Sequence, residues 1–161
     1  MIGQTFSYIR NKIFTELLKN ENIIKALIVE KENFLDAPLN AEQEQYINQP
    51  TSLIRKYIYP YKKFFDTVTE KKTIISTELK NFRKQGKNYR SGRLTFYILV
   101  PVDFEKTTHG VRYDYIADEM EAIFEKTTIG EFSFEDRGDI DVGDRYIGHY
   151  ITFTITEFHI V

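Results

Sequence analysis

The sequence contains no cysteine and no tryptophan, and it has only four prolines among its 161 residues. Without cysteine the chain cannot form disulfide bonds, bind zinc through thiolates or use a cysteine nucleophile. No stretch approaches the roughly 20 apolar residues that span a bilayer. The first residues also lack the basic and apolar segments of a signal peptide. We therefore expect a soluble, unprocessed protein that makes no contact with a membrane.

The chain has almost no net charge, because 24 acidic side chains balance 22 basic ones. Such a balance gives no overall attraction to nucleic acid or to lipid, so any electrostatic function must reside in local patches. The length predicts a single domain over residues 1–161, which is large enough to bury a hydrophobic core.

The sequence also lacks the usual signatures of enzymes. His109, His149 and His159 are far apart and show no paired metal-ligand spacing, and no GxSxG, Walker A or HExxH motif is present. The acidic stretch 135–144 does not follow the ligand spacing of an EF-hand, so a solvated loop is expected there. We predict a protein that is not an enzyme, with no catalytic residue, metal site or cofactor.

Helical periodicity marks three segments. Apolar residues recur every three or four positions near the start of the chain, which predicts an N-terminal helical pair within residues 4–30. A polar stretch rich in asparagine and glutamine predicts a long loop at 33–50. The stripe from Tyr113 to Phe124 predicts the clearest amphipathic helix of the chain.

Alternation of side chains predicts four strands, at 73–82, 94–100, 132–134 and 146–158, with a polar hairpin tip at 83–93. The expected fold is therefore α+β. An antiparallel sheet of about four strands carries helices on one face and a long protruding hairpin.

The last strand has two unlike faces, one aliphatic and one of threonine and aromatic residues. We expect the helices to cover the aliphatic face and a neighbouring subunit to cover the other, because monomers rarely expose a large apolar patch. The candidate subunit-interface residues on this second face are Tyr146, Tyr150, Thr152 and Thr154.

Opposite charges gather in two other places. Six basic residues lie on the predicted hairpin and its tip: Lys80, Arg83, Lys84, Lys87, Arg90 and Arg93. They are candidates to face DNA phosphates or an acidic partner, and a solvated hairpin is the plainer alternative. The predicted helix carries Asp114, Asp118 and Glu121 as further candidate interface residues. Such surfaces allow copies to associate head to tail, which closes into a ring when the rotation permits.

The order of these segments resembles a known family. A helical pair, the segment Leu53–Pro60, a long hairpin, the segment Gly110–Met120 and the closing strand Tyr146–Ile155 are similar to the layout of the tail terminator and tail-completion proteins of tailed bacteriophages. The resemblance implies a non-enzymatic virion protein that is made in the host cytoplasm. It would form a ring, commonly hexameric, that caps the tail tube, stops its growth and meets the head connector, with a possible passing contact with DNA.

Two alternatives stay open. The insertion at 33–50 departs from a simple terminator and leaves a neck or head-tail joining protein of the same junction as a second reading. Aromatic residues on an open sheet beside Arg90 and Arg93 are also typical of a single-stranded nucleic-acid-binding module, although no RNP-like motif is present.

Overall fold

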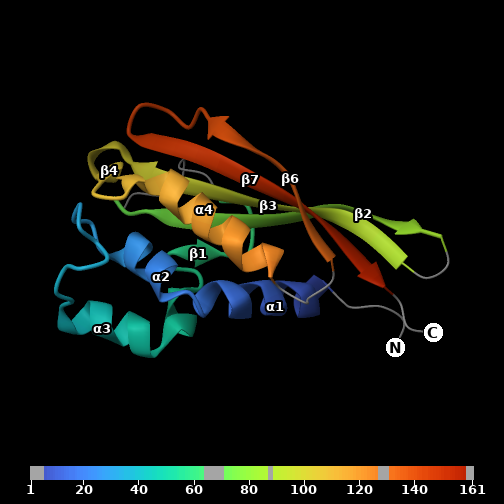
Figure 1. Ribbon diagram of the computed structural model, residues 1–161, viewed down its shortest axis with the longest axis horizontal. Coiled ribbons are helices and arrows are strands. Elements are labelled where there is room, and N and C mark those ends of the chain that lie inside the picture. The colour runs from blue at the N-terminus through green and yellow to red at the C-terminus, as the bar shows by residue number, and fades with distance from the viewer. Residues whose placement is uncertain (1–5, 64–70, 87–88, 127–130, 159–161) are drawn as a thin grey trace.

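The computed structural model describes residues 6–63, 71–86, 89–126 and 131–158, and Figure 1 shows their arrangement. The helices are α1 (Phe6–Leu18), α2 (Glu21–Ile28), α3 (Ala41–Asn48) and α4 (Arg112–Glu125). The main strands are β1 (Ile58–Tyr59), β2 (Ile74–Gln85), β3 (Tyr89–Pro101), β6 (Glu131–Ile140) and β7 (Tyr146–Phe158). Shorter elements are the 3₁₀ helices η1 (Pro50–Leu53) and η3 (Val102–Phe104) and the strand pair β4 (Lys106–Thr107) and β5 (Gly110–Val111). The predicted α+β class is confirmed.

The main strands form one sheet in the order β1-β2-β3-β7-β6. β1 runs parallel to β2, whereas the other neighbouring pairs are antiparallel. The sheet therefore has five strands and is mixed, where about four antiparallel strands were expected. The difference is β1, whose two residues are too few to show an alternating pattern in the sequence.

Three helices, α1, α2 and α4, cover one face of the sheet, and the hydrophobic core lies between the two layers (Figure 1). Phe96 of β3 lies opposite Ile151 of β7, and Leu94 opposite Phe153, so these side chains share a face. The ring of Phe96 lies 5.4 Å from that of Phe124 in α4. Each fully buried side chain of this size contributes about 1.5–3 kcal/mol. The predicted assignment of the aliphatic face of β7 to the helices is confirmed.

The predicted N-terminal helical pair is present as α1 and α2. Ile9, Ile13 and Leu17 bury one side of α1. The Asn20 side chain then accepts a hydrogen bond of 3.0 Å from the backbone N–H of Ile23 and caps α2. A cap of this kind stabilises a helix by about 1 kcal/mol.

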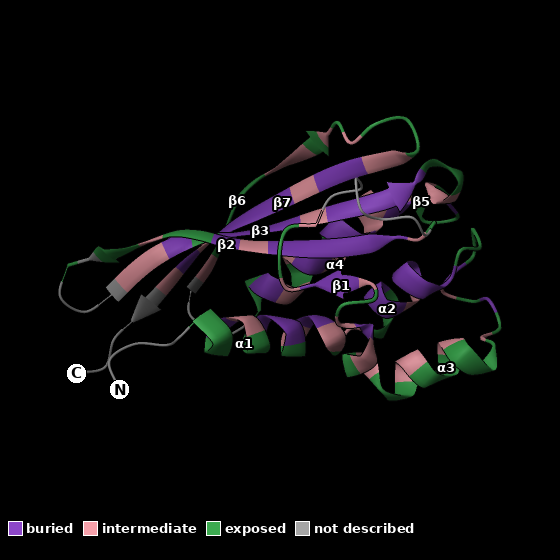
Figure 2. Ribbon diagram, turned by 180° about the vertical axis from the view of Figure 1, so that it is seen from behind, coloured by how far each residue is buried: buried purple, intermediate pink, exposed green. Residues whose placement is uncertain are grey.

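The loop predicted at residues 33–50 is wrong in its second half, because α3 forms there. Its start is a capping box: the Gln43 amide donates to the Asn40 side chain at 2.8 Å, and the Asn40 amide donates to the Gln43 side chain at 3.0 Å. The polar composition that suggested a loop belongs to a helix with no buried residue. Figure 2 accordingly shows α3 as exposed and intermediate along its length.

Two predicted loops are also wrong, because strands extend into them. Within the hairpin tip predicted at 83–93, Lys84 lies opposite Arg90 in the paired strands β2 and β3. The chain turns near Gly86, whose φ of 75° suits a residue without a Cβ. At the opposite edge of the sheet, strand β6 includes the first part of the acidic stretch 135–144, which was predicted as a loop. The hairpin end of β2 and β3 projects past the helices (Figure 1).

Arg112 at the start of α4 links the helical layer together. Its side chain is fully buried, and its guanidinium donates five hydrogen bonds of 2.8–3.3 Å. All five acceptors are backbone carbonyl oxygens, those of Ala26, Val29, Glu30, Lys31 and Phe104. Burial lowers the pKa of Arg112 to about 10. The side chain thus fixes the end of α2 and the residues after it against α4.

Candidate functional site

The face of the sheet opposite α1, α2 and α4 is called the open face here, since no described helix lies on it. Most of it is polar, and its side chains are bonded to one another. The Thr95 and Thr152 hydroxyls share a hydrogen bond of 3.0 Å, and the Tyr150 hydroxyl donates to Asp136 at 2.7 Å. The hydrogen bond to Asp136, together with burial, raises the pKa of Tyr150. Another predicted interface residue, Thr154, donates to a carboxylate oxygen of the neighbouring strand at 3.2 Å.

Among the described residues, apolar side chains gather at one end of the open face. Tyr59, Ile74 and Leu99 form a small cluster there, with Ile140 and Val142 packed beside them. The open face is therefore not the large exposed apolar patch expected from the sequence, and the hydrophobic argument for a neighbour on it does not hold. Tyr146, the remaining predicted interface residue on β7, is half-buried, and burial raises its pKa.

A β-bulge in β2 decides where the basic side chains point. The pairing with β3 shifts by one residue between Lys80 and Arg83, and Asn81 within this stretch has a φ of 61°. Residues three apart on a regular strand point to opposite faces, but one extra residue restores the same face. Lys80 and Arg83 therefore both lie on the open face, together with Arg93, which pairs opposite Lys80.

The other described basic residues lie on the helix side of the hairpin. Lys84 and Arg90 are directly opposite each other, and the guanidinium carbon of Arg90 lies 5.6 Å from the ring centres of both Phe6 and Phe82. Lys87 lies outside the described residues. The six basic residues are thus divided between two faces instead of forming one continuous patch.

On the open face the basic residues stand among acidic ones. Lys80 pairs with Glu78 at 3.3 Å and Arg93 with Glu135 at 2.8 Å, whereas Arg83 is exposed and has no ion pair within the described chain. Two adjoining hollows of ≈ 320 Å³ and ≈ 330 Å³ share Arg93 and Glu135. Exposed ion pairs contribute only about 0.2–1 kcal/mol, so these charges are able to exchange partners with another molecule.

A second bulge, in β6, decides in the same way which face of the sheet each residue of the acidic stretch lies on. Its pairing with β7 shifts by one residue between Phe134 and Asp136. Glu135 and Asp136 consequently lie together on the open face, where they contact Arg93 and Tyr150. The shift also turns the following residue, Arg137, to the helix side.

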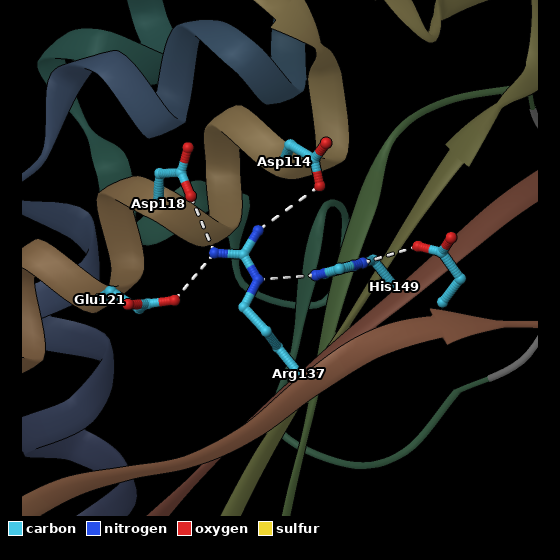
Figure 3. A network of polar contacts seen from close by, with 6 residues as sticks. Asp114, Asp118, Glu121, Arg137 and His149 are labelled. Carbon is cyan, nitrogen blue, oxygen red and sulfur yellow. Dashed lines mark hydrogen bonds and ion pairs between the residues drawn. The ribbon is translucent and has the colours of Figure 1, made fainter.

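Arg137 is the centre of a polar network between β6 and α4 (Figure 3). Its Nη1 donates to Asp118 and Glu121, both at 2.8 Å, and its Nη2 lies 3.5 Å from Asp114. Burial opposes the charge of Arg137, but the hydrogen bonds to Glu121 and Asp118 outweigh it, so the pKa of Arg137 is raised. The three candidate interface carboxylates on α4 therefore already have a partner in their own chain.

His149 completes this network as a structural residue. It is buried on β7 and stacks on Tyr113 of α4 with ring centres 5.0 Å apart. Its Nε2 lies 3.1 Å from Nε of Arg137, and its Nδ1 lies 3.0 Å from Asp139. Because Arg137 can only donate, Nε2 must accept, and the ring proton sits on Nδ1 and points to Asp139. His149 is thus a buried residue whose two ring nitrogens both have partners within the chain.

The described ranges contain neither a metal-binding cluster nor a membrane-spanning helix. No cluster of three or more histidine, aspartate and glutamate side chains is arranged there to hold a metal ion. Among the same residues, no helix combines the length and the apolar character needed to cross a bilayer.

The sequence model of the YomW family matches residues 20–155, from the cap of α2 to near the end of β7. The chain belongs to the YomW family. This is a phage-type name, so the membership supports a bacteriophage protein, although not the tail terminator family specifically. No curated protein matches the chain.

The region shared with the YomW family contains the two arginines that the sequence reasoning missed as organising residues. Arg112 and Arg137 both lie within residues 20–155, whereas α1 lies outside this range. An arginine among the acidic residues of a predicted loop, or at the start of a helix, gives no sign of burial on its own. Their roles depend on contacts with segments far away in the sequence.

Proposed function

We propose that this YomW family protein is a structural virion protein of a tailed bacteriophage, which forms a ring at the head-proximal end of the tail tube. In that position it ends tube growth and joins the tail to the head connector. The layout that resembles tail terminators supports this role. Membership of the phage-type YomW family supports the more general assignment to a bacteriophage.

The observation that carries the proposal is that exposed charges of opposite sign lie near the two edges of the sheet. The strand order puts the basic hairpin toward one edge and the acidic strand β6 at the opposite edge. Lys80 and Arg83 are exposed on the first, and Glu135 and Asp136 on the second. Copies with such complementary surfaces on opposite sides associate head to tail, and a head-to-tail contact is the kind that builds rings.

The projecting hairpin supports the second part of the role, which is contact with other virion proteins. Lys84 and Gly86 are exposed at the hairpin end of the sheet, which extends past the helices (Figure 1). A ring needs its outer contacts on surfaces that the neighbouring subunits leave uncovered. In our proposal the hairpin reaches from the ring to the tail tube protein or to the DNA that passes through it.

The two alternatives differ in how well the structure supports them. A neck or joining protein of the same junction uses the same surfaces and differs only in its position. A single-stranded nucleic-acid binder is supported less, because Glu78 and Asp136 accept hydrogen bonds from the hydroxyls of Tyr97 and Tyr150. Carboxylates beside an aromatic platform repel the phosphates that such a platform must bind.

Size-exclusion chromatography with light scattering tests the proposal, on the chain alone and after addition of the tail tube protein of the same phage. We expect a hexameric ring alone or on mixing. The control is a Glu42→Lys, Glu44→Lys variant, which changes two exposed charges of α3 away from the sheet edges and should assemble as the parent does. A chain that stays monomeric in both conditions and binds oligonucleotides with a steep salt dependence would overturn the ring and favour the nucleic-acid binder.

A further inference from the structure

We propose that the ring is held together by strand pairing, with the outer edge of β2 in one copy hydrogen-bonded to the outer edge of β6 in the next. The inference rests on the proposed ring and specifies its contact. The partner at each edge is a second copy of this chain.

Both strands have an edge without a strand neighbour among the described residues. β1 pairs with β2 only at Ile75 and Ser76, so no strand of the described residues pairs with β2 on that side from Glu78 onward. β6 is the last strand at the other end of the sheet. An uncovered edge presents backbone N–H and C=O groups that another strand can use.

The strand directions suit this contact. β2, β3, β7 and β6 alternate in direction, because each neighbouring pair is antiparallel. β2 and β6 therefore run in opposite directions. In a head-to-tail ring whose axis lies along the strands, rotation from one copy to the next keeps these directions. The β6 edge of one copy then meets the β2 edge of the next as an antiparallel pair, and the alternation continues through the contact.

The charges on the open face match across the same contact. The bulge in β2 puts Lys80 and Arg83 on this face, and the bulge in β6 puts Glu135 and Asp136 there. Side chains on one face of adjacent strands lie about 4.5–5.5 Å apart at Cβ when they are directly opposite. Two basic residues of one copy are thereby brought beside two acidic residues of the next.

The helix side of the contact is apolar. Phe134 of β6 lies opposite Phe153, which fixes it on the helix side, and yet it is 44% exposed at the sheet edge. On the same side of β2, Leu79 and the half-buried Phe82 lie near the uncovered edge. Pairing β6 with β2 covers Phe134 with apolar side chains while the open face joins opposite charges.

The charges also exclude the wrong contacts. Charged residues and bulges on edge strands are a common protection against unwanted pairing. Here the exposed charges have opposite signs at the two edges, Lys80 and Arg83 on β2 and Glu135 and Asp136 on β6, so β2 against β2 and β6 against β6 both bring exposed charges of the same sign together. Only β2 against β6 is electrostatically favourable, and that contact is head to tail.

Paired charge reversals test the contact. One variant carries Lys80→Glu and Arg83→Glu, and the other carries Glu135→Lys and Asp136→Lys. We expect each variant alone to run as a monomer, because its β2 and β6 edges then carry charges of the same sign. An equal mixture should recover assembly, because the acidic edges of one variant then meet the basic edges of the other. Circular dichroism checks that both variants remain folded, and the α3 double variant Glu42→Lys, Glu44→Lys serves as the matched control.

Introduced thiols give a second readout that does not depend on charge. Because the chain has no cysteine, Arg83→Cys and Glu135→Cys supply the only thiols. The double variant should form a ladder of covalent multimers on oxidation, whereas each single variant should not. Self-linking of either single variant would overturn the head-to-tail contact.

The outcomes separate this inference from the proposed function. Rings that form equally well in the parent and in both charge-reversed variants would refute strand pairing and leave the ring itself intact. A parent chain that stays monomeric with and without the tail tube protein would refute the proposed function and the contact with it. Recovery of assembly in the mixture alone supports both.

Discussion

Replacing Arg112 with methionine is the sharpest test of how the helical layer is held together. The side chain has no exposed surface, and each of its five hydrogen bonds ends on a backbone carbonyl. Methionine has a similar length and fills much of the space, so the change removes the donors with little effect on packing. The carbonyl oxygens of Ala26 and Val29 lose a buried donor at 2.8 Å.

The expected loss follows from these carbonyls. An acceptor left buried without a donor costs about 1–3 kcal/mol, which gives about 2–6 kcal/mol for Ala26 and Val29 together. Part of this is offset, because the buried charge and its desolvation cost are also removed. We expect a net loss of about 3 kcal/mol in the free energy of unfolding. Arg112→Lys should lose a similar amount, since lysine keeps the buried charge but lacks the planar fork that reaches five acceptors.

Urea unfolding followed by circular dichroism measures these losses as shifts of the midpoint. The control is Arg145→Met, which changes an exposed arginine and should stay within about 0.5 kcal/mol of the parent. An Arg112→Met variant that unfolds within the error of the parent would show that these hydrogen bonds do not stabilise the fold. Full recovery by lysine would show that charge alone, and not the geometry of the guanidinium, is what matters.

Two further predictions concern other polar contacts. Arg137→Gln should lower the free energy of unfolding by about 1–2 kcal/mol, because it removes the hydrogen bonds from Arg137 to the half-buried Glu121 and the buried His149. Urea unfolding measures the loss, and an unchanged midpoint would contradict a stabilising network. Burial and, after it, the bond to Glu78 raise the pKa of Tyr97 to about 12 from 10.0, so the folded state holds this proton more tightly than the unfolded chain. The resulting stabilisation is complete below pH 10 and is lost as the pH rises toward 12. In Tyr97→Phe the free energy of unfolding should therefore fall less steeply with pH over this range. An equally steep fall in the variant would contradict this assignment.

Elements with a long and regular pattern were predictable from the sequence. The alternation of β7 predicts the strand 146–158, and the structure has Tyr146–Phe158. The stripe of α4 predicts 113–124, and the helix is Arg112–Glu125. In both cases one face is buried over many residues, so the pattern repeats often enough to fix the bounds.

Short or polar elements were not predictable in the same way. β1 has two residues, and α3 has no buried residue, so neither leaves a hydrophobic period. The sequence did contain one signal for α3, the capping box of Asn40 and Gln43. Polar composition outweighed that signal in the interpretation of residues 33–50.

The candidate site was only partly predictable, because its geometry depends on two bulges. Simple alternation puts Lys80 and Arg83 on opposite faces, and it gives no reason for Arg137 to turn toward α4. Each bulge adds one residue and reverses these assignments. The charges were therefore correctly located in the chain, while the faces on which they lie became clear only from the pairing of the strands.

The mass of the particle that the chain forms with the tail tube protein tests the central claim most directly. Native mass spectrometry of the mixture should show a closed assembly of the 19.1 kDa chain, as a hexamer bound to tube protein. The mixture of the two charge-reversed variants should give the same assembly with both variants present. If the chain appears in the spectrum of this mixture only as the free 19.1 kDa monomer, the account is contradicted.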